Sequence, residues 1–172
     1  MTSIIKVNNI QNSSGNTAMT ISGTGVVTPK TTSYVWVYPQ GTSGYTSVAD
    51  NAYLPFNTIY QSAGSGSSDF NTSTYKYTAP VKGLYFIDFF TISSGASDNK
   101  SWHLNVSDTT ICQTFWSRET RTCTGSVTIQ LNAGEVMGLQ SHSTSYYYRN
   151  SNTMPSEEIY TRMIVNLIQE LT

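Results

Sequence analysis

Few side chains in this sequence have the chemistry of a nucleophile or a general base. The two histidines are His103 and His142, and the two cysteines are Cys112 and Cys123. Covalent catalysis needs a nucleophile, a base and an orienting group within reach of one another. His103 stands in an apolar, strand-like run and is interpreted as a strand residue with satisfied hydrogen bonds. His142 lies among Ser and Thr and is expected in a loop, so the sequence predicts no enzyme and no catalytic residue.

The acidic residues are too scattered to form a catalytic or metal-binding cluster. Asp50, Asp69 and Asp108 each stand in a turn-like context. A glycosidase needs a facing pair of carboxylates, and a calcium site needs clustered oxygen ligands. Two cysteines and two distant histidines do not make the closed four-ligand pattern of zinc. We therefore expect no metal and no cofactor.

The two cysteines flank a polar stretch, residues 117–120. If the flanking runs form a hairpin, Cys112 and Cys123 face each other within disulfide range. The first residues show no apolar leader, so we expect synthesis in a reducing cytosol, which favours two free thiols. The sequence leaves both states open.

Two segments have the composition of a recognition surface, in which Tyr, Trp and Arg provide contact area and Ser and Asn provide hydrogen bonds. The first is the expected loop 145–152, and the second is the expected hairpin tip 115–119. Each segment has an alternative role. The tyrosines of 145–152 could instead cross a subunit interface or cover the end of the sandwich, and Trp116 could be a packed residue at the end of a strand. The candidate binding residues are Tyr146, Tyr147, Tyr148, Arg149, Trp116 and Arg118.

The elements that would position these residues are short strands. Apolar and polar residues alternate in runs separated by Gly, Ser and Asn, which is typical of an antiparallel sandwich or barrel. The final run also fits a helix, but its alternation predicts a closing strand. The predicted strands cover residues 3–10, 18–21, 33–39, 51–60, 73–80, 83–92, 101–107, 109–116, 122–131, 135–143 and 157–171.

The composition excludes several classes of protein. The chain has 172 residues, which suits one domain with a short appendage. Only 11% of residues are charged, and the net charge is -1, so we expect no nucleic-acid partner. The surface must be solvated by the 24 Ser and 25 Thr. No stretch approaches ~18 apolar residues, so no membrane insertion is expected.

The composition changes near residues 28–32. Residues 1–32 have few aromatic side chains, whereas Tyr and Trp follow at once. We interpret 1–32 as an N-terminal arm and 33–172 as the main domain. Two short strands cannot bury enough surface to be stable alone, so the arm needs a partner unless it is a flexible tail.

The central run 83–92 is apolar on both faces. In a small sandwich only one face of a sheet points inward, so the other face must meet another layer or another subunit. The alternation places Tyr85 and Phe89 on one face and Phe86, Asp88 and Phe90 on the other.

Asp88 is the unusual residue of this run, because a lone buried carboxylate is costly unless it is paired. A basic group such as Arg162 or Lys82 could pair with it near the axis of a cyclic oligomer, or a strand bend could expose it to water. The predicted oligomer-interface residues are Tyr85, Phe86, Asp88, Phe90 and Arg162.

Three segments of the main domain together resemble the C1q/tumour-necrosis-factor superfamily. Residues 75–86 (YKYTAPVKGLYF), 54–57 (LPFN) and 127–136 (VTIQLNAGEV) occur in the family's order and spacing. The resemblance implies an all-β jelly roll that forms a homotrimer. The end of the chain departs from the family, since residues 159–165 replace its usual Phe-Ser-Gly-Phe-Leu. No Gly-X-Y stalk precedes the domain, which argues against a complement-like or adipokine-like molecule.

The arm is similar to another group of proteins. Residues 3–21 resemble the opening of fibre and appendage proteins of tailed phages, where such a segment docks on the virion. The combination implies a trimeric knob of a tail fibre or head fibre, assembled in the host cytoplasm, that binds a host-surface glycan or protein. The alternatives are a capsid decoration protein without a receptor and, third, an envelope depolymerase.

Overall fold

The computed structural model describes residues 9–11, 17–21, 27–29, 32–41, 45–92, 100–116, 122–142, 146–149 and 161–171. Contacts divide the chain into two compact units, Met1–Thr32 and Ser33–Thr172. The first unit contains β1 (Asn9–Gln11), β2 (Thr17–Ile21) and β3 (Val27–Pro29), which pair antiparallel in that order. The sequence predicted two strands here, and β3 is the strand that it missed.

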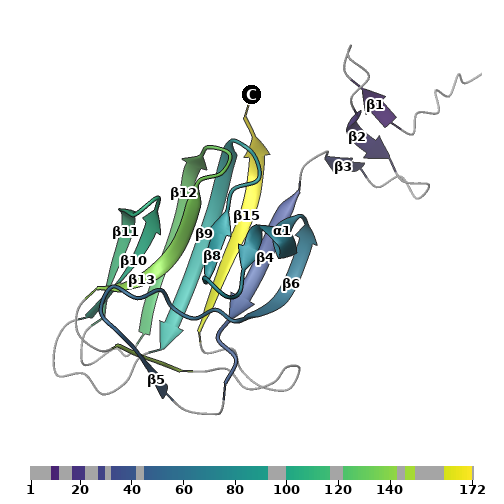
Figure 1. The fold of residues 1–172 in the computed structure, drawn as a ribbon. Coiled ribbons are helices and arrows are strands. Elements are labelled where there is room, and N and C mark those ends of the chain that lie inside the picture. The colour runs from purple at the N-terminus through teal and green to yellow at the C-terminus, as the bar shows by residue number, and fades with distance from the viewer. Residues whose placement is uncertain are drawn as a thin grey trace, which may run out of the picture. The chain divides into compact units, whose positions relative to one another are not determined.

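The second unit is a sandwich of two five-stranded antiparallel sheets (Figure 1). The sheet named here the β9 sheet has the order β12 (Thr122–Leu131), β9 (Gly83–Ile92), β15 (Arg162–Glu170), β4 (Ser33–Tyr38), β6 (Thr58–Gly64). The β10 sheet has the order β11 (Thr109–Trp116), β10 (Lys100–Val106), β13 (Val136–His142), β8 (Lys76–Thr78), β7 (Phe70–Asn71). The predicted all-β sandwich is confirmed, and the final run is a strand.

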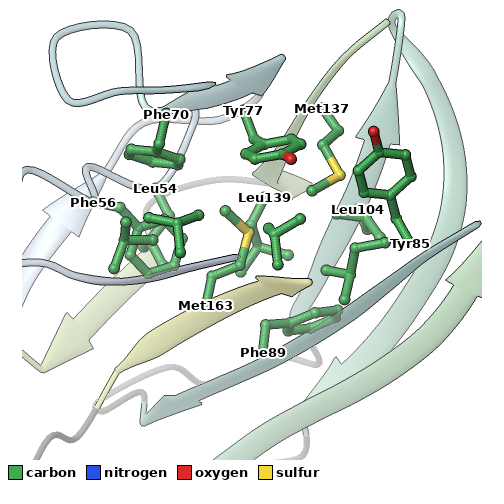
Figure 2. Packing of buried hydrophobic residues seen from close by; sticks show 14 of the residues in the cluster. Leu54, Phe56, Phe70, Tyr77, Tyr85, Phe89, Leu104, Met137, Leu139 and Met163 are labelled. Atoms are coloured by element: carbon green, nitrogen blue, oxygen red, sulfur yellow. The ribbon is translucent and has the colours of Figure 1, made fainter. Parts of the chain in front are cut away.

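Alternation along the strands builds the core between the sheets. In β9, the side chains of Tyr85, Ile87 and Phe89 are fully buried, while their neighbours in sequence are only partly buried. Trp102 and Leu104 on β10 approach them from the other sheet and are also fully buried. Figure 2 shows these layers meeting, with aromatic, leucine and methionine side chains filling the space. This packing is the main stabilising term of the unit.

The segment 75–86 forms a tight corner that leads into β9. The Tyr85 hydroxyl donates to the Val81 carbonyl at 2.7 Å, and its ring meets Tyr77 edge to face at 6.0 Å between centroids. Gly83 has no room for a side chain, because an added Cβ would lie 2.6 Å from the Gln169 carbonyl oxygen. The glycine at the start of this strand is therefore required by the close approach of β15.

A buried hydrogen-bond network ties the short helix α1 (Gly66–Asp69) to both sheets. The Asp69 carboxylate accepts from the hydroxyls of Ser33 and Ser65, each at 2.6 Å. Since Ser33 donates to Asp69, its oxygen accepts from the Tyr77 hydroxyl at 2.5 Å. Burial raises the pKa of Tyr77, so this phenol remains a donor.

The prediction that residues 109–116 and 122–131 pair as a hairpin is wrong. β12 pairs with β9, whereas β11 pairs with β10, so the connection passes from one sheet to the other. Cys112 and Cys123 consequently lie on strands of different sheets, and Cys123 is buried in the core. His142, expected in a loop, is the last residue of β13.

Candidate functional site

The outer side of the β9 sheet carries an unusual number of apolar side chains. Because Val35 and Ile87 point inward, their neighbours in sequence point outward, and the pairing of β9, β15 and β4 sets them side by side. We call this surface the apolar face. Its residues on the three central strands are Tyr34, Trp36, Leu84, Phe86, Asp88, Phe90, Arg162, Ile164 and Asn166.

The apolar face is incompletely covered by its own chain. Phe86 is 37% exposed, and Tyr60, whose ring packs edge to face on Trp36 at 4.5 Å, is 42% exposed. Ile168, in the bulge of β15, is 55% exposed. Patches of this kind on a folded domain mark sites of association.

Two polar atoms on this face lack partners among the described residues. The indole Nε1 of Trp36 and the Nε of Arg162 are buried, and neither makes a hydrogen bond to a residue that the structure describes. A buried donor without an acceptor costs roughly 1–3 kcal/mol. The Arg162 guanidinium lies over the Phe90 ring, 5.5 Å from its centroid.

Four of the five predicted interface residues lie on the apolar face: Phe86, Asp88, Phe90 and Arg162. Tyr85 does not, because it is fully buried on the inward side of β9. Its hydroxyl and ring are both engaged inside the domain, so its inclusion in the interface was wrong.

A second feature lies where β11 and β12, the edge strands of the two sheets, come together. An open groove of about 450 Å³ runs along this edge. Ile111 lies on its rim and is 45% exposed. The sequence did not indicate the groove. Its lining residues are Val106, Ser107, Thr109, Ile111, Ile129, Gln130, Leu131 and Glu135.

The outer side of the β10 sheet is polar and makes its hydrogen bonds internally. Asn105 donates to the side-chain carbonyl of Gln140 and accepts from the Thr110 hydroxyl at 2.9 Å. Gln140 in turn donates to the Asn51 carbonyl at 2.5 Å. The alternation of Ser101, His103 and Asn105 with apolar residues in the sequence already indicated that one side of this strand is polar.

His103 belongs to the same network. Thr110 Oγ1 lies 3.3 Å from its Nδ1, and Ser101 Oγ lies 3.2 Å from its Nε2. The Thr110 hydroxyl donates its one proton to Asn105, so its oxygen can only accept from His103 Nδ1. The proton of neutral His103 is therefore assigned to Nδ1. The His142 ring stacks on it at 4.3 Å between centroids. Burial, and secondarily His142, lowers the pKa of His103. These contacts fit the predicted structural role.

The predicted binding residues lie in two places. Tyr146–Arg149 form the strand β14, which pairs with β5 (Tyr45–Val48), so the expected loop is wrong at these four residues. Figure 1 shows β5 crossing one end of the sandwich. Trp116 is the last residue of β11, and Arg118 lies outside the described residues.

The described residues show neither a metal site nor a membrane helix. No group of three or more His, Cys, Asp or Glu side chains in the described part of the chain could hold a metal ion. None of the described helices has the length and apolar character needed to cross a membrane.

Residues 39–157 match the sequence model of the C1q domain. No curated protein sequence matches the chain. Among solved structures, the globular domain of zebrafish complement 1qA protein is 16% identical and has a TM-score of 0.60, covering 81% of this chain and 99% of that one.

Two further solved structures show the same fold. The Eiger TNF of S. frugiperda is 15% identical with a TM-score of 0.58, and the match covers 83% of this chain and 96% of that one. Murine APRIL is 10% identical with a TM-score of 0.55, and the match covers 80% of this chain and 99% of that one.

Proposed function

The chain belongs to the C1q domain family, and from that premise we propose that residues 33–172 form a homotrimeric binding knob. The observation that carries this proposal is the apolar face. Its exposed Phe86, and the buried Trp36 Nε1 and Arg162 Nε that find no acceptor in the described part of the chain, are costly in an isolated copy. A neighbouring copy would remove the apolar surface from water and provide acceptors.

The groove beside Ile111 supports the same proposal. In a closed ring of three copies each interface is heterologous, so two different surfaces must fit together. Among the described residues of the second unit, the exposed large apolar side chains are Tyr60, Phe86 and Ile168 of the β9 sheet and Ile111 at the groove. We infer that the edge with Ile111 packs on part of the apolar face of the next copy, while the strands β9 and β15 of the three copies meet near the axis.

We propose that the knob serves attachment. Three copies of one weak contact give avidity, which suits recognition of a repeated surface such as a host glycan. The β5–β14 pair at the end of the sandwich carries Tyr146, Tyr147, Tyr148 and Arg149, residue types suited to that role. The likeness of residues 3–21 to phage appendage proteins supports an arm that docks the trimer on a virion.

Native mass spectrometry of the full chain tests the trimer. We expect a species of three copies at micromolar concentration. Ile111→Glu should shift it to single copies, because the variant places a charge at the groove that packs on the next copy. The matched variant Thr78→Glu, on the exposed part of the β10 sheet, should leave the trimer unchanged. A wild-type protein of one copy would contradict the proposal.

Particle and cell-binding assays test the attachment role. Removing residues 1–32 should leave a trimer that no longer joins virions. The trimer should bind host cells, and Tyr147→Ala should weaken that binding. Virions without the protein that adsorb normally but lose heat resistance would identify a capsid decoration protein instead.

A further inference from the structure

We propose that Asp88 of one copy forms an ion pair with Arg162 of the next copy at the centre of the trimer. This inference rests on the proposed trimer and adds to it a specific electrostatic contact. The starting observation is that both charged groups are half-buried on the apolar face. Covering that face takes both charges further out of water, which is costly unless each finds a partner.

Their positions place them close together at the middle of the β9 sheet. Arg162 stands opposite Phe90, and Asp88 stands opposite Ile164, so the two charges are diagonal neighbours on β15 and β9. These strands occupy the second and third places of the five-strand order. On β9 and β15 the charges have Phe90 and Ile164 as neighbours, whereas on the edge strand β12 the exposed Ser126 lies beside Asp88.

The two groups do not satisfy each other within the described chain. No ion pair or hydrogen bond joins Asp88 to another described residue, and the Arg162 Nε has no acceptor among those residues. The guanidinium instead lies over the Phe90 ring of the same face, 5.5 Å from its centroid. A carboxylate and a guanidinium that remain unpaired in one copy are complementary between copies.

Other described groups are poor partners for Asp88. Lys76 lies over the Tyr53 ring, 4.1 Å from its centroid, and belongs to the β10 sheet. Lys82 is exposed and precedes β9. The lining of the edge groove provides one carboxylate, Glu135, and no cation. Among the cations whose side chains the structure describes, Arg162 is thus the one that lies on the face with Asp88.

Charge reversal in the full-length protein tests the pair. Asp88→Arg puts two cations on the face, and Arg162→Asp puts two anions there. Each should raise the concentration for half-assembly at least ~100-fold, as expected for an uncompensated buried charge. The double variant D88R/R162D should return that concentration to within about tenfold of the wild type. Thr78→Arg and Thr78→Asp are matched charge controls and should have no effect.

Mixing the two single variants distinguishes a pair between copies from a pair within one copy. A mixed trimer contains two interfaces of opposite charge, so native mass spectrometry should detect mixed trimers where each variant alone gives single copies. Absence of mixed trimers together with rescue by the double variant would overturn the contact between copies. Failure of the double variant to assemble better than the single ones would overturn the pairing itself.

Two further results separate this inference from the proposed trimer. Single variants that assemble like the Thr78 controls would overturn the ion pair and leave the trimer intact, whereas a one-copy wild-type protein would overturn both. Loss of assembly in Glu135→Gln, with no effect of Asp88→Asn, would assign Arg162 to the groove carboxylate and also reject the pair. Should charge reversal abolish the far-ultraviolet β signal, Asp88→Asn and Arg162→Gln, with their double variant, provide the same coupling test.

Discussion

The two sheets of the sandwich turn very different outer faces away from the core. On the β10 sheet, Asn105, Gln140 and His103 donate and accept among themselves and their neighbours. On the three central strands of the β9 sheet, most of the outward residues are aromatic or aliphatic, and the buried Trp36 Nε1 and Arg162 Nε have no hydrogen-bond partner among the described residues. A polar face whose buried groups satisfy one another needs no partner, whereas an apolar face with unpaired donors is suited to one.

The prediction with the largest expected effect compares two adjacent residues on opposite sides of β9. Phe89 is fully buried in the core, so Phe89→Ala should cost about 3–5 kcal/mol of unfolding free energy. Phe90 lies on the apolar face, so Phe90→Ala should weaken assembly more than it lowers the stability of each copy. Urea unfolding and native mass spectrometry measure the two effects, and equal unfolding losses would show that the two sides of β9 do not differ.

A charge on each outer face provides the next test. Phe86→Glu should weaken trimer assembly by roughly 100-fold, or about 2.8 kcal/mol, because the carboxylate must be desolvated at the interface. The β-sheet signal should persist, since Phe86 points away from the core. Thr78→Glu adds the same charge to an exposed position of the β10 sheet and should leave assembly unchanged. Equal behaviour of both variants would remove the distinction between the faces.

Local alternation was enough to predict much of the fold. The bounds of β9, β11 and β12 agree with the predicted runs, because each run alternates over eight or more residues. The apolar face also follows from alternation, once one side of β9 is assigned to the core. Asp88 and Phe86 were therefore placed correctly on it.

Features that depend on pairing between distant segments could not be predicted in this way. The four-residue strand β14 pairs with β5, about a hundred positions earlier, and no period is readable in so short a run. The polar stretch between β11 and β12 has the composition of a hairpin turn, and that composition does not tell whether the two strands pair with each other or belong to different sheets. The edge groove exists because β11 and β12 belong to different sheets, so it was missed for the same reason.

The polar face has its own test, which should affect folding and not assembly. Asn105→Ala removes a buried side chain that accepts from Thr110 and donates to Gln140, so both of these residues lose that partner. We expect a loss of about 1–3 kcal/mol in unfolding free energy and an unchanged trimer. A trimer that dissociates while the unfolding free energy stays constant would assign an interface to the wrong sheet.

The smallest expected effect is the dependence of stability on pH through His103. Its pKa is lowered in the folded protein by burial and by the stacked His142, so the unfolded chain binds the proton more readily. Unfolding therefore takes up a proton between the lowered folded value and the ordinary value of about 6.5, and stability must fall as the pH drops through that window. His103→Gln should reduce this slope, and comparing the urea midpoints of both proteins between pH 7.5 and 5, values chosen to span about 6.5, measures it. If stability changed with pH equally in the variant and the wild type, the polar face would not hold His103 neutral. The internal hydrogen bonding of the polar face would then have no measurable effect on the protonation of this histidine.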